Sequence, residues 1–237
     1  FGMSGISISD LDQDGDFDIL YTNGDTLDMD AEEDFDPHAV HGAAWLENDG
    51  FGGFTEHELT RVWGAYANAP FDYDSDGDLD IIVGTFQLDI VYSPTTYIHV
   101  DMVLLINDGN QNFTRQDITD GMRYMLTMDV GDFDGDGAPE VILAPRGYSK
   151  APIVVLTLEG GPPTLRSEGI PLRMVDLGLP EGEDPLSKWG GARMAAIDWD
   201  GDGRMDLVVA QVDSEGYNYL DPATGRAPED QRDRYTR

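Results

Sequence analysis

The sequence has 237 residues and a formal net charge of −33, from 47 acidic and 14 basic residues. This charge excludes nucleic acid and anionic membrane surfaces as partners, because both would be repelled, and no apolar run is long enough for insertion into a membrane. A hydrophobic content of 40% predicts a folded chain despite the charge, and the absence of cysteine leaves no disulfides.

The first unit, residues 1–63, begins with a small apolar run at 5–9 that predicts a strand. An acidic stretch, DLDQDGDFD, follows at 10–18, and the apolar run DILYT then predicts a second strand. Two more strands are expected at 43–48 and 54–59. Asn48-Asp49-Gly50 lies between them and permits the positive φ angles of a hairpin turn.

The same order recurs in units 64–123, 124–189 and 190–237, whose acidic stretches begin 62, 60 and 66 residues after the one before. First strands are expected at 65–71, 125–131 and 192–197, and third strands at 102–107, 153–158 and around 217–220. Fourth strands are expected at 113–118 and 164–169. Repeated units of short antiparallel strands predict one all-β domain over residues 1–237, a β-propeller of about four four-stranded blades with the last blade incomplete.

Each acidic stretch lies between the first and second strands and has carboxylates at positions 1, 3, 5 and 9, with glycine at position 6. The chain must curl for these side chains to converge, and Gly15, Gly77, Gly137 and Gly203 permit the curl. Position 2 is apolar in every copy (Leu11, Tyr73, Phe133 and Trp199), and we expect it to anchor the loop on the core. An all-oxygen ligand set favours Ca2+, so we expect about four ions, with position 7 giving its backbone carbonyl. The expected ligands are Asp10, Asp12, Asp14, Asp16 and Asp18; Asp72, Asp74, Asp76, Asp78 and Asp80; Asp132, Asp134, Asp136, Ala138 and Glu140; and Asp198, Asp200, Asp202, Arg204 and Asp206.

Two alternatives compete with this interpretation. The EF-hand loop begins alike, but it needs Glu at position 12 and flanking helices, whereas position 12 here is Tyr21, Val83, Leu143 or Val209. Solvated acidic turns are the other alternative, and four glycine-containing copies at near-constant spacing argue against them.

The acidic loop, the apolar strand after it and the hairpins WLENDGFGGF (45–54) and LLINDGNQNF (104–113) resemble the FG-GAP/VCBS repeat. That resemblance implies a calcium-binding propeller like those of integrin α-chain heads and bacterial extracellular proteins, with ligands at loop positions 1, 3, 5, 7 and 9. The third unit departs from the pattern in its LEGGPP hairpin, and Glu140 stands where the family has Asp. The family fixes fold and metal but not activity.

Family propellers have more blades than the four units here, and only a polar tail follows the possible strand at 217–220. We expect part of a larger propeller, a compact four-bladed ring, or a subunit whose open edge another chain completes. Because the chain begins at Phe1, we also expect a trimmed product or a piece of a longer protein.

Insertions interrupt the repeat at 23–42 and 87–99. The first is acidic and ends with His38 and His41, and it suggests a solvated loop, an extra cation site or an acidic contact surface. The second is rich in tyrosine and threonine and suggests either a recognition loop or a loop packed over the propeller.

No catalytic motif is present, since the clustered aspartates are explained by calcium and the histidines are scattered. We therefore expect a protein that is not an enzyme, with a structural or adhesive role outside the cell or on its surface, whose partners are copies of itself or a surface protein or glycan. A carbohydrate- or protein-binding module is the alternative, and a polysaccharide lyase or hydrolase on a propeller scaffold is a third.

Overall fold

The computed structural model describes residues 3–24, 37–86, 100–118, 125–133, 137, 139–145, 154–157, 189–199, 201 and 205–213. These residues form antiparallel sheets and one short helix, α1 (Pro37–Val40). In this part of the chain no helix has the length and apolar character needed to cross a bilayer.

Each unit contributes one antiparallel sheet, and the sheets are numbered here in chain order. Sheet 1 has the order β1 (Gly5–Ser9), β2 (Asp18–Thr22), β3 (Gly42–Asn48) and β4 (Phe54–Arg61). Sheet 2 has the order β5 (Ala65–Phe71), β6 (Asp80–Thr85), β7 (Met102–Ile106) and β8 (Thr114–Ile118). Sheet 3 comprises β9 (Met125–Gly131), β10 (Glu140–Pro145) and β11 (Val154–Thr157), and sheet 4 comprises β12 (Trp189–Ile197) and β13 (Asp206–Asp213).

The strands lie where the sequence predicts them, and successive strands pair with one another in every sheet. The main difference is β12, which begins at Trp189 and not at residue 192. The strands expected at 164–169 and around 217–220 lie outside the described residues, as do most of the first insertion and all of the second. The all-β, antiparallel prediction is therefore confirmed.

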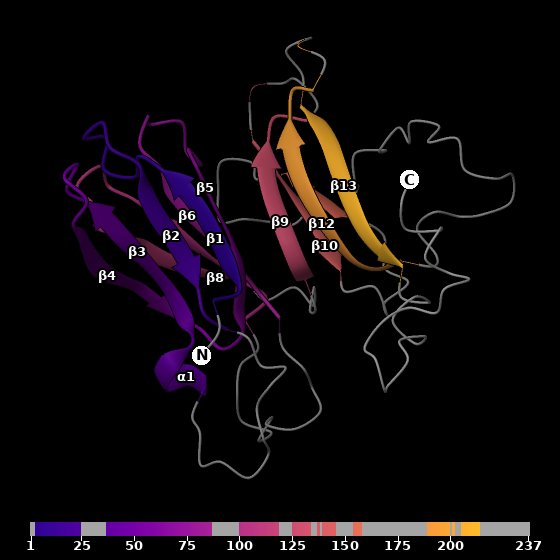
Figure 1. The fold of residues 1–237 in the computed structure, drawn as a ribbon, viewed down its shortest axis with the longest axis horizontal. Helices are drawn as coiled ribbons and strands as arrows, with labels where there is room; N and C mark the ends of the chain where they lie inside the picture. Colours follow the sequence, from indigo (N-terminus) through magenta and orange to yellow (C-terminus); the bar gives the residue numbers. More distant parts are fainter. Residues whose placement is uncertain are drawn as a thin grey trace, which may run out of the picture.

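The first strands of the sheets contact one another in chain order. β5 contacts both β1 and β9, and β9 contacts β12, so each sheet packs its face on the next (Figure 1). Among the described residues, no comparable contact joins β1 to β12 or β13. The four sheets therefore form an open row, and no closed ring is present in this part of the chain.

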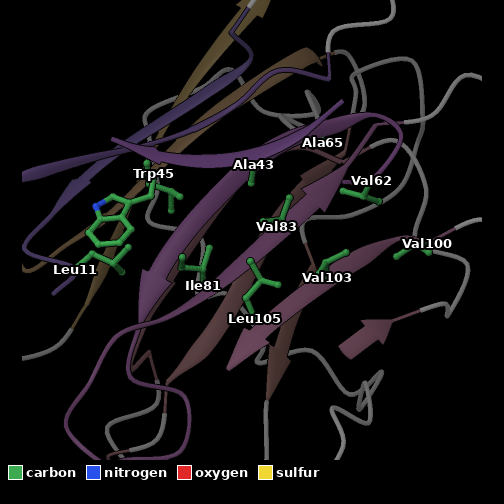
Figure 2. Packing of buried hydrophobic residues seen from close by; sticks show 11 residues of the cluster. Leu11, Ala43, Trp45, Val62, Ala65, Ile81, Val83, Val100, Val103 and Leu105 are labelled. Atoms are coloured by element: carbon green, nitrogen blue, oxygen red, sulfur yellow. The ribbon is translucent and has the colours of Figure 1, made fainter. Parts of the chain in front are cut away.

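Two apolar clusters fill the space between neighbouring sheets. Between sheets 1 and 2, Leu11 and Trp45 pack with Ile81, Val83 and Leu105 (Figure 2). Between sheets 2 and 3, the opposite face of sheet 2 packs on Met128, Val141 and Leu143 of sheet 3. The central strands of sheet 2 are consequently buried on both faces, as their continuous apolar sequence predicts.

Sheets 1 and 4, at the ends of the row, each have one face that no described sheet covers. We expected the apolar residue at position 2 of each acidic stretch to anchor the loop on the core. Leu11 does so, with 1% of its surface exposed, and Tyr73 packs partly against the core. The expectation is wrong for Trp199, which is 74% exposed because no described sheet follows sheet 4.

Candidate metal centres in the acidic loops

Each acidic stretch lies between two antiparallel strands, which excludes the flanking helices of an EF-hand. The glycine at position 6 has positive φ in three copies, with values of 101° at Gly15, 96° at Gly77 and 90° at Gly137. Gly203 lies outside the described residues. A Cβ at any of these three glycines would meet open space, so their requirement is conformational and not steric.

In loops 1, 2 and 4, position 4 also adopts the left-handed conformation, which was not predicted from the sequence. Gln13 and Ser75 both have φ of 62°, and Gly201 has φ of 76°. The signal was weak because Gln and Ser are not typical of this conformation. Gln13 also donates a hydrogen bond from Nε2 to the carbonyl oxygen of Gly77 (2.7 Å), which joins the first loop to the second.

The curl brings three carboxylates together in each of the first two loops. Single oxygens of Asp10, Asp12 and Asp18, at positions 1, 3 and 9, lie within 4.8 Å of one another. Asp72, Asp74 and Asp80 form the same group in the second loop.

Positions 5 and 7 have different surroundings. Asp14 and Asp76, at position 5, are exposed, and each accepts the backbone N–H of position 7, at 2.9 and 3.2 Å. The side chain of Asp78, at position 7, has a buried Oδ1 without a hydrogen-bond partner. Ligation by position 5 and by the position 7 carbonyl stays a prediction.

The position 9 carboxylate closes the loop. Asp18 is 1% exposed, and its Oδ2 accepts the backbone N–H of Leu11 (3.0 Å). The equivalent bond in loop 2 runs from the Tyr73 N–H to Asp80 (2.7 Å). The remaining oxygen of each carboxylate accepts a hydrogen bond from the neighbouring hairpin.

The hairpin asparagines are site residues that the sequence analysis treated only as turn formers. The backbone N–H of Asn48 donates to Asp18 Oδ1 (2.8 Å), and its side-chain amide donates to the carbonyl oxygen of Phe17 (3.0 Å). Asn107 makes the same pair of bonds to Asp80 (2.8 Å) and Leu79 (3.2 Å). The recurrence of Asn-Asp-Gly one hairpin after the acidic loop was the available signal.

The glycine two positions after the asparagine in each hairpin also contributes to this arrangement. Gly50 and Gly109 have φ of 69° and 76°, and a Cβ there would lie 2.2 and 2.8 Å from the carboxylates of Asp16 and Asp78. Glycine therefore supplies both the turn and room for the position 7 side chain. The hairpin and the acidic loop form one unit.

Loops 3 and 4 keep the closing bond. Glu140 is 1% exposed, and its carboxylate accepts the N–H of Phe133 (2.8 Å), so Glu replaces Asp here without loss of this contact. In loop 4, Asp206 accepts the N–H of Trp199 (3.0 Å). At position 1, Asp132 accepts the N–H of Gly137 (3.0 Å), and Asp198 that of Gly201 (2.8 Å). The remaining expected ligands, Asp134, Asp136, Ala138, Asp200, Asp202 and Arg204, lie outside the described residues.

Burial and mutual repulsion disfavour the charged form of several loop carboxylates. Burial raises the pKa of Asp80 to about 6, against the lowering effect of the N–H groups of Asn107 and Tyr73. Burial, with the neighbouring charge of Asp14 and Asp18, likewise raises the pKa of Asp12. A bound cation would favour the charged form of both carboxylates and so oppose these shifts.

The donor set fits a hard divalent cation. All the grouped atoms are carboxylate oxygens, which suit Ca2+ and Mg2+ better than softer metals. Asp10 Oδ1 is buried and has no hydrogen-bond partner, an arrangement that costs free energy unless another group satisfies it. Asp10, Asp12 and Asp18 would hold the ion in loop 1, and Asp72, Asp74 and Asp80 would hold it in loop 2.

A second polar cluster lies beside loop 1. The rings of Trp45 and His57 stack with centroids 4.6 Å apart, and His57 Nε2 lies 2.6 Å from Glu47 Oε2. With Asp12, Asn112 and Phe113 these residues line a cleft of about 560 Å3. The sequence analysis found no partner for His57, because Trp45 and His57 meet only through the pairing of β3 with β4.

Comparison with known proteins adds no relative. No family model matches this chain, and no curated protein sequence matches it either.

Proposed function

We propose that this chain is a calcium-ordered repeat protein with a structural or adhesive role, of the propeller type that the FG-GAP/VCBS resemblance implies. One observation carries the proposal. In two successive loops the carboxylates at positions 1, 3 and 9 converge, and in the first a buried Asp10 oxygen has no hydrogen-bond partner. No catalytic activity is proposed.

The arrangement of the sheets supports a propeller architecture. Successive antiparallel sheets are stacked face to face, with the first strand of each packed on the first strand of the next. Blades around an axis have this relation. Closure of these sheets into a propeller ring is part of the proposal.

The mechanism is metal-dependent order. Without a cation, the carboxylates of Asp10, Asp12 and Asp18 repel one another at short range. A bound Ca2+ supplies the opposite charge and fixes these side chains, and the bonds from Asp18 then hold both the loop and the Asn48 hairpin. The free energy of calcium binding therefore becomes free energy of folding.

Calcium also favours a location outside the cell. Repeat modules of extracellular proteins bind Ca2+ with dissociation constants of about 0.1–1 mM, a concentration that is available outside cells. Four bound Ca2+ ions would reduce the net charge of −33 to about −25, which still favours solubility.

Isothermal titration calorimetry with CaCl2 tests the proposal. We expect about four sites on the wild-type chain. Asp12→Asn and Asp74→Asn should each remove one site, because each takes one carboxylate from a converged group. Asp117→Asn is the matched control, since Asp117 is an exposed carboxylate on β8 paired with Arg115. Equal stoichiometry in all four proteins would contradict the assignment.

The cleft beside loop 1 favours a second candidate, a carbohydrate- or protein-binding module. The buried indole N–H of Trp45 has no hydrogen-bond partner, and Glu47, His57 and Asn112 offer polar groups close to it. A glycan array tests this candidate. Binding of one glycan class that Glu47→Gln abolishes would support it, and binding to none would remove the carbohydrate form of it.

A further inference from the structure

The two ends of the row of sheets expose apolar faces that are buried at every internal junction. Equivalent residues are found by counting from the acid at position 1 or 9 of each loop. By this count Val208 of β13 corresponds to Ile82 of β6 and Ile142 of β10. Val208 is 42% exposed, whereas Ile82 and Ile142 are each 0% exposed.

Alternation along the strands gives the direction in which each face points. In β6, Ile81 and Val83 belong to the cluster shared with sheet 1, whereas Ile82 belongs to the cluster shared with sheet 3. Val208, the counterpart of Ile82, therefore lies on the face of sheet 4 that would meet a following sheet.

Two more residues belong to this trailing face, defined here as Ile197, Trp199 and Val208. Ile197 is 47% exposed, against 7% for its counterpart Phe71. Trp199 is 74% exposed, against 1% for its counterpart Leu11. All three residues would be core residues if another sheet followed.

The opposite end of the row has a leading face, defined here as Met3, Ile6 and Ile8. Ile6 is 61% exposed, whereas its counterparts Asn68 and Met128 are 9% and 7% exposed. Met128 packs on the preceding sheet, so Ile6 lies on the face that would meet a preceding sheet. Ile8 is 66% exposed and Met3 59% exposed on the same end of the molecule.

We propose that the trailing face of one copy docks on the leading face of a second copy, head to tail. The two faces are the two halves of a junction that the chain already makes between its own sheets, so the new interface continues the internal ones. β1 makes no extensive contact with β12 or β13 within the described chain, so the halves meet between copies. Such an interface is heterologous and adds copies in one direction.

The polar contacts at the internal junctions agree with this direction. Ser7 donates from its hydroxyl to Asn68 of the next sheet, and the N–H of Ala196 donates to Asp129 of the preceding sheet (2.6 Å). At the ends of the row, the residues that correspond to Ser7 and Asn68 are Ala195 and Ile6. Both are exposed and apolar, so they would form an apolar contact in place of the polar one.

The inference rests on the stacked-sheet architecture of the proposed function but not on its calcium. Sedimentation velocity over a concentration series in Ca2+-containing buffer tests it. We expect wild-type protein to form species larger than the 26.0 kDa chain as concentration rises. Ile8→Lys and Val208→Lys should each raise the concentration needed for association roughly tenfold or more, because each places a charge in an apolar interface.

A mixture of the two variants gives the sharpest result. The Ile8→Lys copy keeps an intact trailing face and the Val208→Lys copy keeps an intact leading face, so the mixture should form a 1:1 dimer and stop there. Phe51→Lys is the matched control, since Phe51 is a 97% exposed apolar residue on the β3–β4 hairpin and belongs to neither defined face. It should associate as the wild type does.

The contrary results are distinct. A wild-type chain that stays at 26.0 kDa at every concentration overturns the inference. If both Lys variants then also melt at lower temperature, the two faces meet within one chain. Association that Ile8→Lys and Val208→Lys leave unchanged overturns it as well. Calcium titration of the same samples separates this failure from failure of the calcium proposal, because either can occur alone.

Discussion

At the scale of single residues, the position 9 carboxylate connects three parts of each repeat. Asp80 is fully buried, accepts N–H groups from the loop start at Tyr73 and the hairpin at Asn107, and lies within the carboxylate group of loop 2. Its two oxygens therefore have structural partners, and the proposed calcium site gives the same carboxylate a second role. Replacement of such a residue would affect folding and calcium binding together.

Substitution of the hairpin asparagine Asn107 tests the effect on folding apart from the effect on calcium binding. We predict that Asn107→Ala lowers the free energy of unfolding by about 1 kcal/mol, because it removes the amide that donates to the Leu79 carbonyl (3.2 Å) but leaves the backbone bond to Asp80. Urea denaturation in excess Ca2+ measures the loss. Asn110→Ala is the matched control, as an exposed asparagine in the same hairpin, and an equal loss in both variants would contradict a specific role for Asn107.

The type and spacing of the loop residues predicted that carboxylates converge, as those at positions 1, 3 and 9 do in loops 1 and 2, but not the separate surroundings of each position. Carboxylates alternating at positions 1, 3 and 5 imply convergence around one point. Asp14 is exposed, lies outside the converged carboxylate group of loop 1 and directly follows the left-handed Gln13. A single glutamine in the sequence does not predict that left-handed conformation. Asn48 could be predicted only as a turn residue, because its bonds to loop 1 span 30 and 31 residues and leave no local pattern.

At the scale of elements, the close approach of first strands determines which residues β1 tolerates. A Cβ at Gly5 would lie 2.7 Å from the Tyr66 carbonyl oxygen in β5 and 2.8 Å from Thr22 Oγ1 in β2. Ser4 and Thr22 also donate hydroxyl hydrogen bonds to backbone carbonyls of β5, both at 2.9 Å. The junction of sheets 1 and 2 is therefore narrow and partly polar at its inner end.

We predict that Gly5→Ala lowers the free energy of unfolding by about 1–3 kcal/mol, because the added methyl group meets the Tyr66 carbonyl oxygen, a backbone atom that cannot move independently. Thermal or urea denaturation in Ca2+ provides the measurement. Thr55→Ala, at an exposed position of β4, serves as the control and should change stability little. Wild-type stability of Gly5→Ala would show that the junction opens more easily than this packing implies.

Most elements could be predicted because each strand carries a local signal. Alternation or a continuous apolar run gave the strands, and Asn-Asp-Gly gave the turns between β3 and β4 and between β7 and β8. The start of β12 was missed because Trp189-Gly190-Gly191 reads as a loop, whereas pairing with β13 extends the strand through a register shift near Gly190. Pairing with a distant strand is not visible in a local pattern.

At the scale of the whole molecule, the repeat determines the strand order and apolar pattern of each sheet but not the number of sheets in the assembly. The same apolar pattern produces a two-sided core in sheet 2 and half-covered faces in sheets 1 and 4. The exposure of Trp199 therefore could not be predicted from its own position, because it depends on whether another sheet follows. Burial in this protein is set by neighbours as much as by sequence.

Charge also acts on the whole molecule. A net charge of −33 opposes compaction through self-repulsion, and 18 of the 47 acidic residues lie in the four acidic loops. Bound cations would remove repulsion where the sheets join their loops. Calcium is therefore expected to control global stability and not only the order of single loops.

Thermal unfolding followed by circular dichroism, in 1 mM CaCl2 and again in excess EDTA, tests the central claim most directly. We predict a large fall in the melting temperature on chelation, reversed by added Ca2+ but not by the same concentration of Na+, because the free energy of calcium binding contributes to folding. A melting temperature that is the same in Ca2+ and EDTA would contradict the claim, and the acidic loops would then be solvated turns.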